Sequence, residues 1–410
     1  MTADLSHLSL SEVEKLYQSY KDKKLNLDMT RGKPGADQLD LASALLNNQS
    51  YTSKGGVDCR NYGGLDGLVE AKEMFAPMLG CKPEEVIVGG NSSLTLMHDA
   101  VMRAMVYGVP GSSRPWCKEE KVKFLCPVPG YDRHFGICES LGIEMVAVKT
   151  DDEGPVMEEV KALVANDPTI KGMWCVPKYG NPTGVTYSDR VVKELASMAT
   201  AAPDFRIMWD NAYAVHHLGK GVAPLLPLLQ ACQEAGHPDR ALMFASTSKI
   251  TFAGSGVSFL AASDANRADI LAKIGKQTIG PDKLNTLRHV EFFKSFDGIL
   301  AHMDKHASLL KPKFDVVDEV FTSGLKGLAT WSKPDGGYFV NLDTKPGLAA
   351  KVVQLAADAG VKLTKAGATF PYGKDPQDCN IRIAPSLPPL GEVKTAMEVV
   401  VVCVQLASLM

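Results

Sequence analysis

A short run of apolar, often β-branched residues recurs along the chain, and in most cases a stretch with helical periodicity follows it. The runs are continuously apolar and do not alternate with polar residues, which is typical of parallel strands covered by helices on both faces. Such runs predict seven strands, at 85–89, 122–126, 144–149, 172–176, 205–209, 241–245 and 256–262. The pattern predicts an α/β fold built on a mainly parallel, seven-stranded sheet.

The 410 residues favour more than one domain. Residues 51–288 hold all seven predicted strands and are expected to form a large domain. The remainder reads as a smaller α+β unit made by both ends of the chain, residues 1–50 and 289–410. Within it, a long helical stretch is predicted at 291–324.

Composition excludes several classes of protein. Charged residues make up 22% of the chain and the net charge is −3, so no nucleic-acid partner and no charged membrane surface is expected. No apolar run is long enough to span a membrane, and no signal peptide is visible, so a cytoplasmic location is expected. The 9 scattered cysteines lack a CxxC pair, and His216-His217 has no third ligand at zinc spacing, so no metal site is predicted.

Polar residues follow one predicted strand after another. Because ligands of parallel sheets bind beyond the carboxyl ends of the strands, these residues are expected to meet at one edge. They include Ser92 and Ser93 at a predicted helix start, Tyr131, Asn181, Asp210 with Tyr213, and Ser246, Ser248 and Lys249.

The set suits an aldehyde cofactor that carries a phosphate, a pyridine nitrogen and a phenolic oxygen. A helix N-terminus can bind the phosphate, and Asp210 can keep the ring nitrogen protonated. Lys249 can form a Schiff base with the aldehyde and then act as the general acid/base. Each residue alone has a commoner explanation, since a lysine after a strand is usually solvated and such an aspartate usually caps a helix. Their order and shared location favour the cofactor site.

Five stretches together resemble the fold-type I pyridoxal-phosphate-dependent aminotransferases, in particular the divergent aspartate aminotransferases of subgroup Ic. The resemblance spans nearly the whole chain. The stretches are Asn61-Tyr62-Gly63-Gly64-Leu65-Asp66-Gly67, Asn181-Pro182-Thr183-Gly184, Asp210-Asn211-Ala212-Tyr213, Ser246-Thr247-Ser248-Lys249 and Asn380-Ile381-Arg382-Ile383.

The resemblance implies pyridoxal 5'-phosphate as the cofactor and Lys249, Asp210 and Tyr213 as the catalytic residues. Lys249 would hold the cofactor covalently. Asp210 would pair with the pyridine nitrogen, while Asn181 and Tyr213 would bind the ring oxygen.

The same resemblance assigns the rest of the cofactor site. Ser92, Ser93 and Ser246 would hold the phosphate, Ser248 belongs with the cofactor-binding residues, and Tyr131 would stack on the ring. Many relatives place an arginine shortly after the lysine to neutralise the phosphate. Here residues 250–257 contain no arginine, so the phosphate charge must be met by other groups.

The substrate site is implied in the same way. Arg382 would clamp the α-carboxylate in a bidentate pair, which suits a planar guanidinium. Gly32 would let the backbone approach that carboxylate, and Asn181 would also contact the substrate. Tyr62 would reach the phosphate of a neighbouring subunit, which implies a homodimer with shared active sites.

The expected reaction is ping-pong transamination between aspartate and 2-oxoglutarate, with amino acids and 2-oxo acids as the small-molecule partners. A dicarboxylate needs a second cation, for which Arg288, Arg31 and Lys33 are candidates. An aminotransferase for aromatic or other neutral amino acids remains an alternative, as does a lyase or decarboxylase of the same fold. A cofactor-binding regulator of this fold, or a structural protein without cofactor, also remains open.

Overall fold

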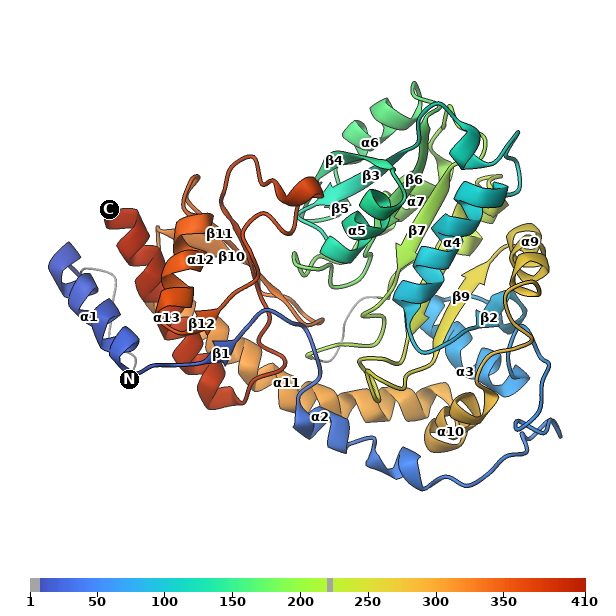
Figure 1. Cartoon of the computed structure of the whole chain (residues 1–410), viewed down its shortest axis with the longest axis horizontal. Helices are drawn as coiled ribbons and strands as arrows, with labels where there is room; N and C mark the ends of the chain where they lie inside the picture. Colours follow the sequence, from blue (N-terminus) through green and yellow to red (C-terminus); the bar gives the residue numbers. More distant parts are fainter. Residues whose placement is uncertain (1–7, 220–223) are drawn as a thin grey trace.

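The computed structural model describes residues 8–219 and 224–410, and its largest sheet has eight strands in the order β2-β9-β8-β7-β6-β3-β4-β5 (Figure 1). Strands β8, β7, β6, β3 and β4 run parallel to one another, β9 is antiparallel to β2 and β8, and β5 is antiparallel to β4. The bounds are β2 (Val86–Val88), β3 (Lys123–Val128), β4 (Glu144–Asp151), β5 (Gly154–Pro155), β6 (Ile170–Cys175), β7 (Arg206–Asp210), β8 (Ala241–Ser246) and β9 (Ser258–Ala262).

The α/β class and the mainly parallel sheet are confirmed, and each of the seven predicted strands is present with its ends shifted by a residue or two. The predicted strand count was one too low. The extra strand, β5, is a two-residue hairpin partner of β4 that enters through Gly154 at φ 133°. A strand this short carries no periodicity that a sequence pattern could reveal.

Both faces of this sheet are buried, and successive residues of one strand enter different cores. In β6, Met173 and Cys175 face one core while Trp174 faces the other. The first core is covered by helices α3 (Val69–Leu79), α6 (Met157–Val164), α7 (Asp189–Ser197), α8 (Leu228–Glu234) and α10 (Lys283–Phe293). The opposite core is covered by α4 (Ser93–Tyr107), α5 (Asp132–Ser140) and α9 (Asp264–Ile274). This double coverage explains why the strands read as unbroken apolar runs.

A third core lies around two smaller sheets built from the ends of the chain. One sheet is antiparallel, with β11 between β10 and β13, and the other pairs β1 with β12 in parallel. Their bounds are β1 (Leu27–Asp28), β10 (Ala329–Trp331), β11 (Val340–Thr344), β12 (Val361–Lys362) and β13 (Asn380–Ile383). The helices of this part are α1 (Leu10–Asp22), α2 (Ala36–Asp40), α11 (Phe296–Gly324), α12 (Ala349–Asp358) and α13 (Leu390–Leu409).

The long helix predicted at 291–324 is two helices in the structure. Helix α10 ends at Phe293, Lys294 adopts φ 65°, and Ser295 caps α11 by accepting a hydrogen bond from the Gly298 N–H at 3.2 Å. A Cβ on Gly298 would lie 1.9 Å from the Phe293 carbonyl oxygen, so the close approach of the two helices requires glycine there.

Helix α11 contributes to two cores, because Ile299 and Met303 pack under the large sheet and Phe314 and Phe321 pack in the third core. All eight strands of the large sheet fall within residues 51–288. We therefore propose a large domain at 51–288 and a smaller domain formed by both ends of the chain. No described helix is long and apolar enough to cross a membrane.

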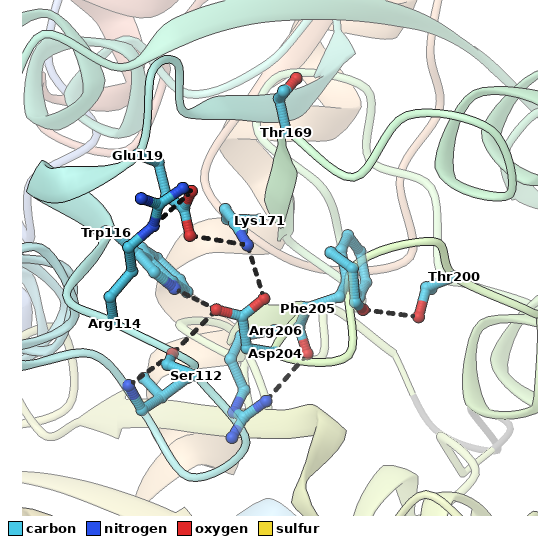
Figure 2. Close-up of polar contacts among 12 residues, drawn as sticks. Ser112, Arg114, Trp116, Glu119, Thr169, Lys171, Thr200, Asp204, Phe205 and Arg206 are labelled. Atoms are coloured by element: carbon cyan, nitrogen blue, oxygen red, sulfur yellow. Dashed lines mark hydrogen bonds and ion pairs between the residues drawn. The ribbon is translucent and has the colours of Figure 1, made fainter.

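A buried polar cluster closes the edge of the large sheet at the amino ends of β6 and β7 (Figure 2). The Asp204 carboxylate, just before β7, accepts hydrogen bonds from Lys171 Nζ, Ser112 Oγ and Trp116 Nε1, each at 2.8 Å. Asp204 and Lys171 are both buried. The cluster therefore fastens the segment before β3 to the sheet, at the opposite edge from the strand ends that carry the predicted site.

Candidate active site

A cavity of about 470 Å³ lies beyond the carboxyl ends of β2, β3, β6, β7 and β8 and reaches β13 of the smaller sheet. Of the residues predicted to hold the cofactor or the substrate α-carboxylate, all except Tyr62 line it. Those residues are Gly32, Ser92, Ser93, Tyr131, Asn181, Asp210, Tyr213, Ser246, Ser248, Lys249 and Arg382. The residues grouped from their strand ends, Ser92 to Lys249, thus share one cavity with Gly32 and Arg382, which the resemblance added.

Lys249 lies in the turn that follows β8. The turn is fixed by Thr247, whose carbonyl accepts from Ile250 N–H at 2.8 Å and whose hydroxyl accepts from Val257 N–H at 2.9 Å. Lys249 Nζ lies 5.1 Å from the centre of the Tyr213 ring. Burial lowers the pKa of Lys249, and the nearby Asp210 carboxylate offsets only part of this effect. The lower pKa increases the fraction of neutral amine, which is the nucleophilic form.

Asp210 ends β7 and is buried in the floor of the cavity. Its Oδ2 lies 3.0 Å from His134 Nε2, and the His134 ring stacks on Trp174 at 4.3 Å between centroids. Its Oδ1 is buried and has no hydrogen-bond partner among the described residues. A buried carboxylate oxygen without a partner is costly, so this atom is suited to a donor that comes with a ligand.

Sequence reasoning missed His134. The available signal was its position on α5, three residues after Tyr131, because residues three apart lie on one helix face. The two rings touch edge to face at 4.9 Å. Burial raises the pKa of Tyr131 and of Tyr213 well above the usual range for phenols, so both hydroxyls stay protonated and can donate hydrogen bonds.

Small residues and a helix N-terminus form another side of the cavity. Ser92 is the N-cap of α4, and its Oγ accepts from Leu94 N–H at 3.2 Å. The Ser246 hydroxyl donates to Ser248 Oγ at 3.1 Å, and Ser248 Oγ donates to the Asn91 carbonyl at 2.9 Å. Ser248 thus also ties the lysine turn to the loop before α4. This side offers hydroxyls, free backbone N–H groups and the positive end of a helix to an anion.

Arg382, on β13, faces these groups across the cavity. Its Nη1 is 2.8 Å from Asp132 Oδ1 and 3.4 Å from Asn181 Oδ1, and its guanidinium lies 5.1 Å from the centre of the Phe339 ring. A Cβ on Gly32 would lie 2.4 Å from Phe339 Cζ, so only glycine fits there without a shift. Asp132 was not predicted, although it directly follows Tyr131.

Four further basic side chains line the cavity: Arg31, Lys33, Arg133 and Lys365. The first two were candidates from the sequence. Arg288, the third candidate, is on α10 and is not among the lining residues. Arg133 and Lys365 were missed, because nothing in their local sequence distinguishes them from solvated surface residues.

Tyr62 lies outside this cavity, with 81% of its surface exposed. The loop that contains Tyr62 is held in place by the buried Lys283. The Nζ of Lys283 donates hydrogen bonds to the carbonyls of Asn61 and Gly63 at 2.6 and 2.7 Å. The loop is therefore fixed while the tyrosine ring projects into solvent.

The family model described as aspartate amino-transferase matches residues 1–410. The chain belongs to this family. An aspartate aminotransferase of Corynebacterium glutamicum is 46% identical over 402 residues, 97% of this chain and 93% of that protein. A Mycolicibacterium smegmatis protein whose name places it only among aminotransferases is 51% identical over 399 residues, 96% of this chain and 93% of that protein.

Solved structures agree with this assignment. An aspartate transaminase of Corynebacterium glutamicum superposes with a TM-score of 0.95 at 46% identity, covering 98% of this chain and 95% of that one. The α-aminoadipate aminotransferase LysN of Thermus thermophilus, at 18% identity and a TM-score of 0.75 over 98% of this chain and 100% of that one, shares the fold. The chain is thus a pyridoxal-phosphate-dependent aminotransferase of fold type I.

The cavity of this aminotransferase fits the cofactor that its family implies. Asp210 Oδ1 has no hydrogen-bond donor among the described residues, and the protonated pyridine nitrogen of the cofactor would supply one. A half-buried lysine with a lowered pKa, Lys249, is the amine that an aldehyde requires. The N-terminus of α4 and its serines can bind a phosphate. Because residues 250–257 contain no arginine, the phosphate charge has to be met by groups such as these.

Proposed function

We propose that this aminotransferase transfers the amino group of aspartate to 2-oxoglutarate in two half-reactions at one site. The observation that carries this proposal is the charge of the cavity. Six basic side chains face two acidic ones: Arg31, Lys33, Arg133, Lys249, Lys365 and Arg382 against Asp132 and Asp210. Such an excess favours substrates with two carboxylates over neutral amino acids. The name of the Corynebacterium glutamicum relative supports the same choice.

Pyridoxal phosphate, when bound, supplies an aldehyde that condenses with amines and a ring that takes up the electron pair released at the substrate α-carbon. In our proposal Lys249 holds the cofactor between turnovers, and its Nζ moves a proton from the α-carbon once substrate has displaced it. Asp210 keeps the ring nitrogen charged, and His134 keeps Asp210 in place. Asn181 and Tyr213 donate hydrogen bonds to the ring oxygen.

The remaining cofactor contacts follow from the same geometry. Ser92, Ser93 and Ser246 bind the phosphate together with the first N–H groups of α4, and Ser248 secures this arrangement through Asn91. Tyr131 stacks on the face of the ring.

Arg382 binds the substrate α-carboxylate in a bidentate pair, with the backbone at Gly32 close beside it. In the structure Asp132 occupies one arm of this guanidinium. A substrate carboxylate that binds through Nη1 must therefore replace Asp132, whereas Nε has no partner among the described residues. The second carboxylate of the substrate is bound by one or more of the other basic side chains of the cavity, which are Arg31, Lys33, Arg133 and Lys365.

The absorbance spectrum of purified protein loaded with pyridoxal phosphate tests this function. Aspartate is expected to convert the band of lysine-bound cofactor into that of the aminated cofactor, and 2-oxoglutarate is expected to restore it. A band that ignores aspartate but responds to phenylalanine or another neutral amino acid would contradict the substrate assignment and keep the enzyme class.

The substitution Arg382→Lys is expected to raise KM for aspartate and for 2-oxoglutarate about 10–100-fold, since a point charge replaces a bidentate pair worth roughly 1.5–3 kcal/mol. Steady-state kinetics with each substrate varied in turn measures the effect. Both half-reactions should suffer alike because both substrates have an α-carboxylate. A KM that changes for only one of the two substrates would contradict this role of Arg382.

We further propose that two copies of the chain share their active sites, with Tyr62 of each copy reaching the phosphate in the other. Exposed apolar side chains in the chain segments around Tyr62 support a surface that a second copy covers. They are Leu46, Tyr51, Val57, Val69 and Ile279. Burying such side chains against a second copy is favourable.

Mixing a Tyr62→Ala variant with a Lys249→Ala variant tests this sharing. Random assortment makes half of the dimers mixed, and each mixed dimer has one intact site, so refolded mixtures should recover up to about one quarter of wild-type activity. Each variant refolded alone is the control. Activity that stays at the mean of the two separate variants would show that Tyr62 does not act across a dimer.

A further inference from the structure

A buried hydrogen-bond network lies behind Lys249, outside the cavity. It consists of Gln38 on α2, His302 and His306 on α11, and Tyr338, all of which are buried. Helix α2 packs beside α11 (Figure 1). None of the four side chains lines the cavity. The chemistry described above does not require any of them.

The network ends on two carbonyl oxygens of the lysine turn. Tyr338 Oη donates to the Lys249 carbonyl at 3.1 Å, and His302 Nε2 lies 2.9 Å from the Ile250 carbonyl. A carbonyl oxygen only accepts hydrogen bonds, so His302 must carry its proton on Nε2.

The orientation of Gln38 fixes the remaining protons. Its Oε1 accepts from the Gly35 N–H at 3.1 Å, which makes the other terminal atom the donor. That Nε2 lies 2.9 Å from His306 Nδ1 and 3.1 Å from Tyr338 Oη, so it donates to both. His306 therefore accepts on Nδ1 and carries its proton on Nε2, which lies 3.1 Å from His302 Nε2. Burial and the neighbouring His302 lower the pKa of His306 to about 4, which keeps the ring neutral.

The result is a branched network in which Gln38 donates to both branches. One branch runs through Tyr338 to the Lys249 carbonyl, and the other runs through His306 and His302 to the Ile250 carbonyl. Gly35 lies three residues after Gly32. Gly32 lines the cavity together with Arg382 and lies against Phe339. Tyr338 also packs on Tyr213, with 5.8 Å between ring centres. The network thus joins the wall that receives the substrate carboxylate to the peptide that carries the amine.

We propose that Gln38, His306 and Tyr338 are positioning residues that hold the Lys249 peptide at a fixed place relative to the Gly32 segment. An apolar contact would fill this space without the cost of burying polar groups, whereas a fully bonded network fixes one geometry. Proton transfer at the substrate α-carbon depends on such geometry, since a displacement of about 1 Å can cost about 10²-fold in rate. The inference rests on the proposed role of Lys249.

The variant Tyr338→Phe tests the proposal, because it removes the bond to the Lys249 carbonyl and leaves the ring in place. We expect kcat to fall about 10-fold or more while KM for aspartate changes less than about 2-fold. The matched control is Ser112→Ala, which deletes a half-buried hydroxyl that donates to Asp204, at the far edge of the sheet. It should lower thermal stability and leave kcat unchanged. A Tyr338→Phe enzyme with wild-type kcat would overturn the proposal.

A second pair of variants works even if Tyr338→Phe folds poorly. In His306→Asn the amide oxygen can replace Nδ1 as acceptor for Gln38, and in His306→Gln the amide nitrogen can replace Nε2 in the contact with His302, which bonds to Ile250. If the network positions the lysine turn, His306→Gln should retain more of kcat than His306→Asn. Equal kcat values for the two variants would contradict the proposal.

Hydrogen exchange of the protein without cofactor gives a readout that is independent of activity. Amides of residues 247–253 should exchange faster in Tyr338→Phe than in wild type and should be unchanged in Ser112→Ala. Unchanged exchange in Tyr338→Phe would contradict the proposal. Wild-type protein that forms no cofactor band at Lys249 would instead overturn the proposed function, so the two failures are distinguishable.

Discussion

Replacing Lys249 by alanine is expected to reduce transamination by at least about 10³-fold, because the same amine holds the cofactor and moves the proton at the α-carbon. Lys249 is a half-buried lysine of the cavity, its pKa is lowered by desolvation, and Asp210 lies close to it. No other side chain on the large-sheet side of the cavity is an amine. Aspartate-dependent formation of oxaloacetate, measured with saturating pyridoxal phosphate, gives the activity.

The control for this substitution is Lys365→Ala, which removes another lysine from the same cavity. That variant should keep the absorbance band of lysine-bound cofactor, whereas Lys249→Ala should lose it and bind the cofactor only reversibly. A Lys249→Ala protein that keeps the band, or keeps activity within about tenfold of wild type, would remove the basis of the assignment.

The substitution Asp204→Ala is expected to destabilise the fold by about 3–5 kcal/mol, although it lies at the opposite edge of the sheet from the cavity. It would leave the buried Lys171 ammonium without its 2.8 Å partner and would free the Ser112 and Trp116 donors (Figure 2). The midpoint of urea denaturation, followed by tryptophan fluorescence and by circular dichroism, measures the loss.

The control is Asp315→Ala on α11, where Lys311 and Asp315 form a solvent-exposed pair at 2.6 Å. Removing this pair should cost only about 0.3–0.5 kcal/mol. If both substitutions shift the midpoint equally, the buried cluster does not stabilise the sheet edge as described.

The Asp204 cluster also predicts a dependence on pH. Burial alone would raise the pKa of Asp204, but the hydrogen bonds from Lys171, Ser112 and Trp116 more than offset it, so the folded-state pKa lies below the ordinary 3.8. A carboxyl with a lowered pKa stabilises the fold above its unfolded pKa, and this contribution is lost as the pH falls below about 3.8 through the folded value. In Asp204→Ala this part of the acid sensitivity should be missing.

The sequence pattern predicted the large sheet well because strands buried on both faces must be apolar at every position. It did not predict the break at Lys294, since both flanking segments have helical periodicity and the break depends on the Ser295 cap and on space at Gly298. It also missed β5, whose two residues pair with β4 only because a tight turn returns the chain.

The cofactor side of the site was predictable for a similar reason. Parallel strands end at one edge, so the residues that follow them must meet there, and Asp210, Asn181 and Lys249 do. Asp132 and Lys365 escaped prediction because they reach the cavity from the start of a helix and from a loop of the smaller sheet. His134 escaped prediction because its contact with Asp210 exists only in the folded chain. Gln38, His306 and Tyr338 show the same limit, because their relation to Lys249 exists only in the folded chain.

The measurement that tests the central claim most directly is reduction of the cofactor-loaded protein with borohydride, followed by peptide mass spectrometry. Reduction makes the bond between cofactor and lysine permanent, so the modified residue can be identified. The account predicts a single stoichiometric pyridoxyl adduct on Lys249, with none on Lys33 or Lys365 in the same cavity. A stoichiometric adduct on another lysine, or none at all, would contradict it.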